Sequence, residues 1–410
     1  MYSDWNSLES EVAAANCSLS VLNPTFPPIV RRDVARIILK CLANGYTNLT
    51  DHTENLEVLD NIAALQTDEQ MQWTMEVICY SLQLDFSDDK DTIEMAVEVY
   101  TNWINTVNFL IDEDSPDGEM KDREDAVPLP IRKNPEPYIQ RMIKHLFNIF
   151  TPRNNSRQST AREIESQAGL CAIVLSSLRS VSNLSKTYNI SSTTWDTLLV
   201  TMLRIGDVLL AGPSDRGDLT DIATGELYMD TLLNVWLHAC VKNFPTPPFW
   251  KTLTEYMQSW RHHSLVVEKW NLTASYLTSR LVDQMHGPGY SQLRGIKEEE
   301  ISSVIHNLSG NVLIQTWYRF LHLIGNPVEI IERETFVRNP KFIKAMARNS
   351  QYQSKPDMHP HLDRLNDIFY ITIKGLTTIV EIFFGWPTRL YRPMEVGDNI
   401  GFYGLTFLHG

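Results

Sequence analysis

The segment Pro28-Ile-Val-Arg-Arg-Asp-Val-Ala-Arg-Ile-Ile-Leu-Lys-Cys-Leu42 shows the pattern that decides the fold class. Its apolar residues recur at i, i+4, i+7, i+8, i+11 and i+12, so they share one face of an α-helix. Pro28 suits the first turn of that helix, and Asn44-Gly45 is a typical stop signal. The segment therefore predicts an amphipathic helix that ends before Asn44.

The same helical period recurs along the rest of the chain. Thr67 and Gln70 have the spacing of a capping box, and Asp88 or Asp89 is placed to cap the next helix. Pro135 opens another helix. Further stripes occupy residues 160–183, 193–211, 220–243, 248–260, 263–286, 298–308, 311–324, 339–348 and 362–385. Alternating strand-like runs bounded by turn pairs are missing, so the sequence predicts an all-α protein.

The helices are arranged either as an irregular solenoid of the HEAT or armadillo kind or as a large α-bundle. The spacing gives about 56 residues per helix pair, against roughly 40–47 in armadillo and HEAT repeats, and no motif repeats at a fixed period. Wide apolar faces favour the solenoid. We expect an N-terminal helical segment (1–111), a solvated, partly extended acidic-to-proline-rich loop (112–134), a helical-repeat region (135–386) and a tail (387–410).

Composition limits the classes of function. The net charge of −14 argues against nucleic-acid or anionic-membrane binding, because both require a cationic surface. The first residues lack the apolar stretch of a signal peptide, and the greasiest segment, 368–386, is interrupted by Lys374 and Glu381, so no membrane span is predicted. Five cysteines without a Cys-x-x-Cys pair fit a reducing compartment. We expect a cytoplasmic protein.

No local catalytic motif is present in the sequence. A phosphate-binding G-x-x-x-x-G-K-[ST] loop, a G-x-G-x-x-G turn, a G-x-S-x-G elbow and an H-E-x-x-H helix are each missing. These chemistries depend on that local geometry, so we assign no catalytic, cofactor-binding or metal-binding residue. An enzyme whose site assembles from scattered residues stays open as an alternative, and so does a generic helical-repeat adaptor.

Two histidine pairs are the candidates for a metal site. His262-His263 follows Trp260-Arg261 at what reads as a corner between two helices, where packing or capping explains the imidazoles better than a shared ion. His359-Pro360-His361 lacks a third ligand at the usual spacing. Nearby Asp363 suits a helix cap or first turn.

Three other strings have both a functional and a structural interpretation. Phe244-Pro-Thr-Pro-Pro-Phe-Trp-Lys251 is either a proline-rich ligand for an aromatic groove or, as we favour, a rigid connection that starts a helix at Pro247 and Pro248. The acidic run at 112–125 is best explained as solvated surface. Arg153-Asn-Asn-Ser156 resembles a kinase site on a loop.

Six strings together, in this order, resemble the N-terminal region of the Ral GTPase-activating protein beta-subunit family, which is related to tuberin and Rap-GAP. They are Met1-Tyr-Ser-Asp-Trp5, Gln72-Trp-Thr-Met-Glu-Val-Ile-Cys-Tyr80, Val99-Tyr-Thr-Asn-Trp-Ile104, Phe244-Pro-Thr-Pro-Pro-Phe-Trp-Lys-Thr252, Trp260-Arg-His-His263 with Val266-Val-Glu-Lys-Trp270, and Thr316-Trp-Tyr-Arg-Phe-Leu-His322 with Asn326-Pro-Val328. The resemblance extends from Met1 to about Gly385, and the tail from Pro387 to Gly410 departs from it.

The resemblance implies a non-catalytic role. In this family the beta subunit pairs with a catalytic alpha subunit, and the complex accelerates GTP hydrolysis by Ral-type small GTPases. The alpha subunit supplies an asparagine that positions the attacking water. The beta subunit carries its own GAP-like domain near a distant C-terminus, so no catalytic residue is carried over to this chain. We expect a regulatory scaffold that forms a heterodimer with the alpha-type subunit and contacts the GTPase only indirectly.

Overall fold

The computed structural model describes residues 26–43, 62, 64–110, 126–151, 161–183, 190–212, 222–287, 300–340, 342–343 and 360–384. Every regular element within these ranges is a helix, which confirms the predicted all-α class. None of the helices in this part of the chain combines the length and apolar character that crossing a bilayer requires.

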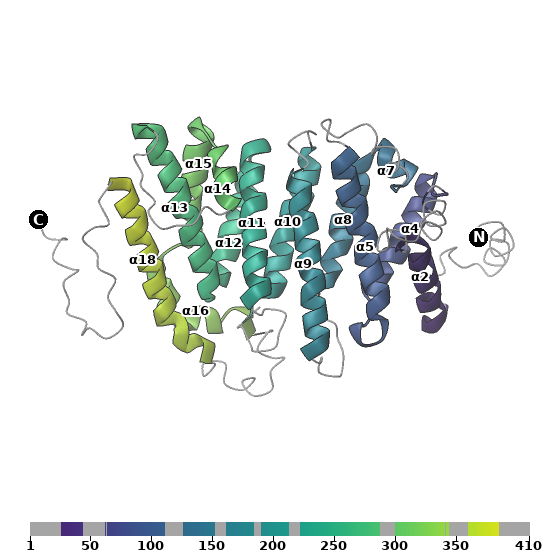
Figure 1. Ribbon diagram of the computed structural model, residues 1–410. Coiled ribbons are helices and arrows are strands. Elements are labelled where there is room, and N and C mark those ends of the chain that lie inside the picture. The colour runs from purple at the N-terminus through teal and green to yellow at the C-terminus, as the bar shows by residue number, and fades with distance from the viewer. Residues whose placement is uncertain are drawn as a thin grey trace, which may run out of the picture.

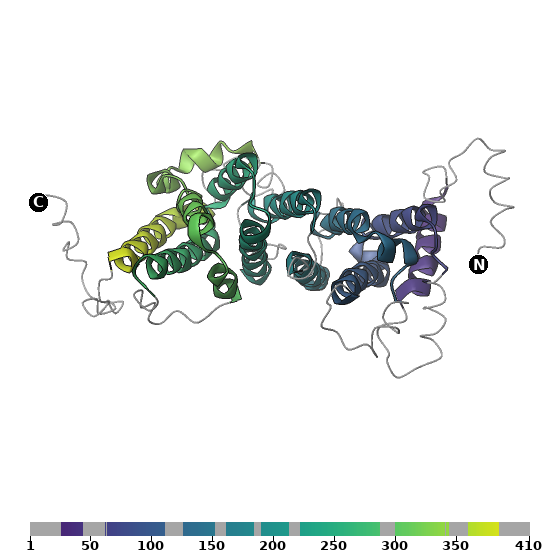
Figure 2. The same ribbon diagram turned by 90° about the horizontal axis from the view of Figure 1, so that it is seen from above.

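The helices form two layers that follow chain order. One layer consists of α2 (Pro28–Ala43), α5 (Phe86–Leu110), α9 (Ala161–Asn183), α11 (Ile222–Lys242), α13 (Ser264–His286) and α18 (Leu365–Phe384), each in contact with the next. The other consists of α4 (Asp68–Ser81), α8 (Pro135–Leu146), α10 (Ser192–Leu210) and α12 (Pro247–Trp260), again in sequence. The result is an elongated stack with α2 near one end and α18 near the other (Figures 1 and 2), as the solenoid interpretation predicts.

The N-terminal end of the stack confirms one cap and corrects another. The hydroxyl of Thr67 accepts a hydrogen bond from Gln70 N, and the Gln70 side chain accepts one from Thr67 N, so the predicted capping box starts α4. The prediction that Asp88 or Asp89 caps the next helix is matched only in part: α5 begins at Phe86, but it consists of two helical stretches that meet at Asp89, whose φ and ψ are non-helical. Asp89 instead lies at a kink inside α5, where its buried carboxylate meets Arg32 and Arg36 of α2.

Part of the expected loop at 112–134 is helical. Residues Leu129–Lys133 form the short helix α7, and Val127, Pro130 and Ile131 around it are buried. Pro130 occupies the first turn, where a missing N–H has no consequence, so prolines that suggested extended chain instead start a helix. The acidic run at 112–125 lies outside the described residues.

The proline-rich string at 244–251 is a rigid connection. Helix α12 begins at Pro247, with a proline in its first turn. Trp250 is buried, and its ring packs against Phe244 and, edge on, against Trp236 of α11. The aromatic residues therefore anchor the connection in the core, which is the interpretation favoured from the sequence.

Beyond α13 the chain adds short elements before it returns to the stack. These are α14 (Glu300–His306), α15 (Gly310–Leu321), the 3-10 helix η3 (Pro327–Ile331), α16 (Arg333–Val337) and η5 (Pro360–Arg364). Another 3-10 helix, η1 (Phe147–Phe150), extends α8. Most of the helix predicted at 339–348 lies outside the described residues, whereas η3 and α16 were not predicted.

Helix α18 lies side by side with α13 (Figure 1). The two helices pack tightly at Gly375, where an added Cβ would lie within 2.1 Å of the Asn271 side-chain atoms. Asn271 Nδ2 donates a hydrogen bond of 3.1 Å to Ile371 O. Any larger residue at 375 would therefore force the Asn271 side chain to move.

Candidate functional site

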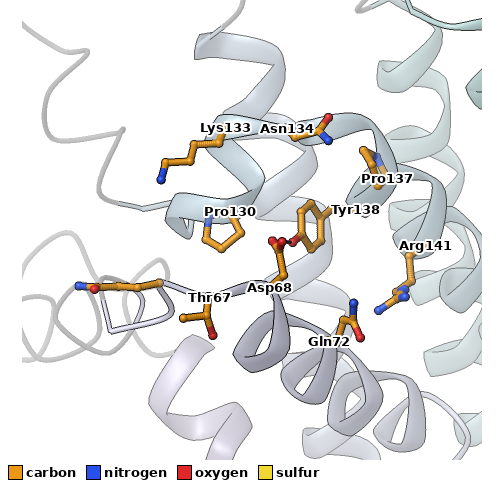
Figure 3. A pocket seen from close by; sticks show the side chains of 10 residues that line it. Thr67, Asp68, Gln72, Pro130, Lys133, Asn134, Pro137, Tyr138 and Arg141 are labelled. Carbon is orange, nitrogen blue, oxygen red and sulfur yellow. Dashed lines mark hydrogen bonds between the residues drawn. The ribbon is translucent and has the colours of Figure 1, made fainter.

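A pocket of about 580 Å³ lies where the start of α4 meets the elbow between α7 and α8 (Figure 3). Ten residues line it: Gln66, Thr67, Asp68, Gln72, Pro130, Lys133, Asn134, Pro137, Tyr138 and Arg141. The capping box of α4 fixes one wall, and the prolines of the elbow fix the other. We call this the α4–α8 pocket.

Tyr138 and Asp68 meet in the middle of this pocket (Figure 3). The Tyr138 hydroxyl donates a short hydrogen bond to Asp68 Oδ1. Burial, and then this hydrogen bond to a carboxylate, raises the pKa of Tyr138 to about 12. Tyr138 therefore stays protonated near neutral pH and acts as a fixed donor between α8 and α4.

The remaining groups of the α4–α8 pocket suit binding better than catalysis. Lys133 and Arg141 contribute positive charge, and neither forms an ion pair with another described residue. The Thr67 hydroxyl already caps α4. The ten lining residues include neither histidine nor cysteine, and Tyr138 is too weak an acid to serve as a general base at neutral pH.

The corner formed by Arg261, His262 and His263 joins α12 to α13 and fastens both to distant backbone. Arg261 Nη1 donates to Ile324 O at 2.8 Å, and its Nη2 pairs with Glu329 of η3 at 2.8 Å. Gly325, in the turn that carries Ile324, has φ of +71°, a left-handed conformation that favours glycine. The guanidinium therefore holds the end of α15 against the corner.

Both histidines of the corner are buried and face backbone carbonyls. His263 Nε2 lies 2.9 Å from Gly212 O, at the end of α10, and His262 Nδ1 lies 2.9 Å from Ser259 O. The His262 ring also packs against Phe336 of α16. Burial is the main reason that the pKa of His263 falls to about 4. The pair serves packing and capping, as the sequence indicated.

The other histidine pair cannot be placed in the same way. His359 and the side chain of His361 lie outside the described residues. Asp363 lies in the first turn of η5, where its exposed carboxylate is 2.6 Å from Arg333 Nη2. The described ranges contain no cluster of three or more histidine, cysteine or acidic side chains that could hold a metal ion. Arg153–Ser156 also lies outside those ranges.

Sequence reasoning missed the α4–α8 pocket. No functional role was predicted for Tyr138 or Asp68 from the sequence. The two are 70 positions apart. Since no short motif links them, only the tertiary packing of α4 against α8 brings them together.

Comparison with known proteins finds similarity to the Ral GTPase-activating protein beta subunit over most of the chain, in agreement with the resemblance noted from the sequence. The family model of the RALGAPB N-terminal domain matches residues 163–288, the region of α9 to α13. The chain is 34% identical to Ral GTPase-activating protein subunit beta of Mus musculus over 387 residues, and 34% identical to that of Homo sapiens over 386 residues. Each alignment covers 94% of this chain and 24% of the relative, so the chain spans about a quarter of those proteins.

A more distant relative has a related name. A Rap-GAP domain-containing protein of Dictyostelium discoideum is 30% identical over 167 residues, which is 41% of this chain and 10% of that protein. No solved structure matches the chain. The chain therefore contains a match to the RALGAPB N-terminal domain and is similar, over 94% of its own length, to Ral GTPase-activating protein subunit beta.

Proposed function

We propose that this chain is the helical scaffold region of a beta-type regulatory subunit in a Ral GTPase-activating complex. The observation that carries the proposal is the similarity to Ral GTPase-activating protein subunit beta, which extends over 94% of the chain and so includes the whole helical stack. In this proposal an alpha-type subunit supplies the catalytic groups, and the chain forms a heterodimer with it.

The use made of the reactive side chains supports a non-catalytic role. Arg261 binds the backbone of Ile324 and the carboxylate of Glu329, and His263 faces the end of α10. An arginine or histidine that acts on a substrate needs access to it, whereas these side chains are buried and engaged with the protein itself. The hypothesis of an enzyme with a dispersed site at this corner is therefore disfavoured.

The shape of the molecule also suits a scaffold. An elongated helical stack presents a large surface for its size, and stacks of this kind commonly bind other proteins along that surface. The net charge of −14 disfavours direct binding to nucleic acid or to anionic membranes. We place the complex in the cytoplasm, where small GTPases and their regulators meet.

Co-purification tests the proposal directly. The full chain, carrying an affinity tag, is co-expressed with an alpha-type subunit, and the two are separated by affinity and size-exclusion chromatography. We expect a stable one-to-one complex. Ral loaded with GTP is then incubated with the chain alone, with the alpha-type subunit alone, and with both.

The chain alone should leave the rate of GTP hydrolysis unchanged, whereas hydrolysis with both should exceed that with the alpha-type subunit alone. Hydrolysis accelerated by the purified chain alone would contradict the non-catalytic role. Two proteins that elute separately at micromolar concentration would contradict the scaffold role.

A further inference from the structure

The outward face of α18 carries an exposed apolar stripe. Tyr370, Ile373 and Val380 are 69%, 41% and 49% exposed, and Thr377 completes the row. They follow one another at intervals of three, four and three residues, and Phe384 continues the series. We call Tyr370, Ile373, Thr377 and Val380 the α18 stripe. Large apolar side chains at this spacing are typical of a helix face that packs against another helix.

One edge of the α18 stripe rests on the folded stack. Phe383 stacks on Trp317 of α15, with ring centroids 6.3 Å apart and planes inclined by 19°. Trp317 is fixed in turn, because its Nε1 donates a hydrogen bond to Thr278 Oγ1 of α13 at 3.0 Å. The C-terminal part of α18 is therefore held in place, so a partner would meet a prearranged surface.

Charged residues mark the other edge at seven-residue intervals. Asp367, Lys374 and Glu381 occupy equivalent heptad positions beside the α18 stripe. None of the three forms an ion pair with another described residue. In packed helices such flanking charges determine which partner is accepted and in which register. Along this edge the charges are acidic (Asp367), basic (Lys374) and acidic (Glu381). A partner helix with basic, acidic and basic residues in the matching positions would complement them.

This charge pattern argues against a second copy of the chain. If two α18 stripes packed antiparallel about a twofold axis, with Tyr370 opposite Val380 of the other copy, Lys374 would face Lys374. Asp367 would face Glu381 of the other copy. Like charges at these positions are destabilising. A pair of identical copies is therefore disfavoured.

Two other occupants fit less well. A lipid surface would meet a flank with one basic and two acidic residues, on a chain of net charge −14. The chain's own segment 386–410 contains Pro387, Pro393, Gly397, Gly401 and Gly404, a sequence that breaks any helix long enough to match the α18 stripe.

We propose that the α18 stripe is the docking site for an amphipathic helix of another polypeptide, with apolar residues in heptad spacing and a basic–acidic–basic flank. This proposal deepens the proposed function. It rests on that function for one point, namely that the docked polypeptide is a subunit of the same complex. The contact would use side chains that are already exposed and positioned, without rearrangement of α18.

A synthetic helix tests the proposal without any natural partner. The probe has three heptads with leucine at positions a and d. The residues that flank this apolar face on both sides are Lys in the first heptad, Glu in the second and Lys in the third. A second probe carries Glu, Lys and Glu instead. Each is labelled with a fluorophore and titrated with the full chain, at peptide concentrations at which the probe is monomeric. We expect the first probe to bind at least tenfold more tightly than the second.

Two variants of the full chain locate the binding. Ile373→Glu with Val380→Glu should weaken binding of the first probe at least tenfold. Ile29→Glu with Ile37→Glu places the same charges at exposed positions of α2, at the other end of the stack, and should leave binding unchanged. Equal affinity for the two probes, or binding that survives the α18 substitutions, would overturn the proposal.

Further measurements report on the rejected occupants. If the chain dimerises through α18, light scattering would give twice the monomer mass for the wild-type chain and the monomer mass for the α18 variant. A membrane-binding face would make the chain sediment with phosphatidylcholine–phosphatidylserine vesicles until α18 is substituted. Either result would overturn the proposal.

The proposed function fails separately. If the probe binds as expected and the alpha-type subunit does not co-purify with the chain, only the proposed function is contradicted. If the alpha-type subunit co-purifies equally well with the α18 variant, only the docking proposal is contradicted.

Discussion

The two ends of the helical stack expose different chemistry. On α2 the outward row is Ile29, Asp33, Ile37 and Lys40, in which charged residues alternate with apolar ones. The corresponding row on α18 has no charge among Tyr370, Ile373, Thr377 and Val380. Water solvates the first surface readily, whereas the second resembles the faces that are buried between helices elsewhere in the stack.

The two ends are also attached differently. Helix α2 is tied to α5 by charge, since Asp89, 3% exposed, is 2.8 Å from Arg32 Nη2 and 3.2 Å from Arg36 Nη2. Helix α18 is tied to α13 by close packing at Gly375 and by the hydrogen bond from Asn271 to Ile371. The comparison teaches that an end helix can be held by ion pairs or by a side chain packed against a glycine, and the two attachments should respond to different perturbations.

Acid should weaken the half that contains α18 through His263. Its pKa is about 4 in the folded protein and about 6.5 when unfolded, so the unfolded state binds more protons between these values. The stability that His263 contributes is therefore complete above pH 6.5 and is lost as the pH drops toward 4, by about 3 kcal/mol. Urea unfolding between pH 7 and pH 4 measures this loss.

Substitution isolates the share of His263. His263→Gln should remove its own share of the pH dependence, and a second share should remain from His145 of α8, whose pKa burial also lowers to about 4. His286→Gln at the exposed end of α13 should leave the whole slope in place. A wild-type slope that persists in His263→Gln would show that other groups carry the pH dependence.

Gly375→Ala should loosen the α18 end. The new methyl group would overlap the Asn271 amide, which must turn away and give up its hydrogen bond, at a cost of about 2 kcal/mol. The matched control is Gly169→Ala in α9, where nothing lies within 4 Å of the added Cβ. There, alanine should stabilise the helix by about 0.5–1 kcal/mol. Thermal unfolding compares the pair, and equal shifts would refute close packing as the attachment of α18.

Asp89→Ala should loosen the α2 end. It removes the carboxylate shared by Arg32 and Arg36, and because both arginines are partly exposed, water can solvate them again. We expect a loss of about 1.5 kcal/mol, which 1 M NaCl should reduce. Asp88→Ala, 3.9 Å from Arg32 and well exposed, should change stability by less than about 0.5 kcal/mol. If the two variants lose equal stability, Asp89 has no special role.

Glutamate at exposed apolar positions should have the smallest effect on folding. Ile373→Glu with Val380→Glu should change the free energy of unfolding by less than about 0.5 kcal/mol, because neither side chain is buried in the isolated chain. Chemical denaturation measures the change. A loss above about 2 kcal/mol would mean that the α18 stripe is already covered within the chain, and the contrast between the two ends would disappear.

The fold was largely predictable because its signals are local. The helical period of 28–42, the Thr67–Gln70 cap and the prolines at 247–248 each depend on neighbours within one or two helical turns. The predicted face of 28–42 was only partly right, because α2 buries Ala35, Leu39 and Leu42 and exposes Val30 and Ile37. Local signals failed where two uses of a residue compete. Asp89 is of a residue type that often caps helices, yet its carboxylate forms ion pairs with arginines of α2. Pro130 lies in the first turn of a short helix instead of in an extended loop.

The candidate sites were less predictable because they depend on distant pairs. The buried corner at His262 could be recognised from its flanking sequence, but its carbonyl partner Gly212 lies 50 positions away. The meeting of Tyr138 with Asp68 has no sequence signal at all. The exposed face of α18 could not be told from a buried one, because periodicity shows that a helix has an apolar face and not what covers it.

The hydrogen bond from Asn271 to Ile371 joins residues 100 positions apart, and this separation has a consequence for synthesis. At about 5–20 residues per second, a ribosome needs about 5–20 s to make the intervening chain. During that interval α13 has no α18 to pack against, whereas α2, α4 and α5 and the helices that contact them have already been synthesised. We therefore expect chaperones to bind nascent chains whose synthesis has paused within this interval.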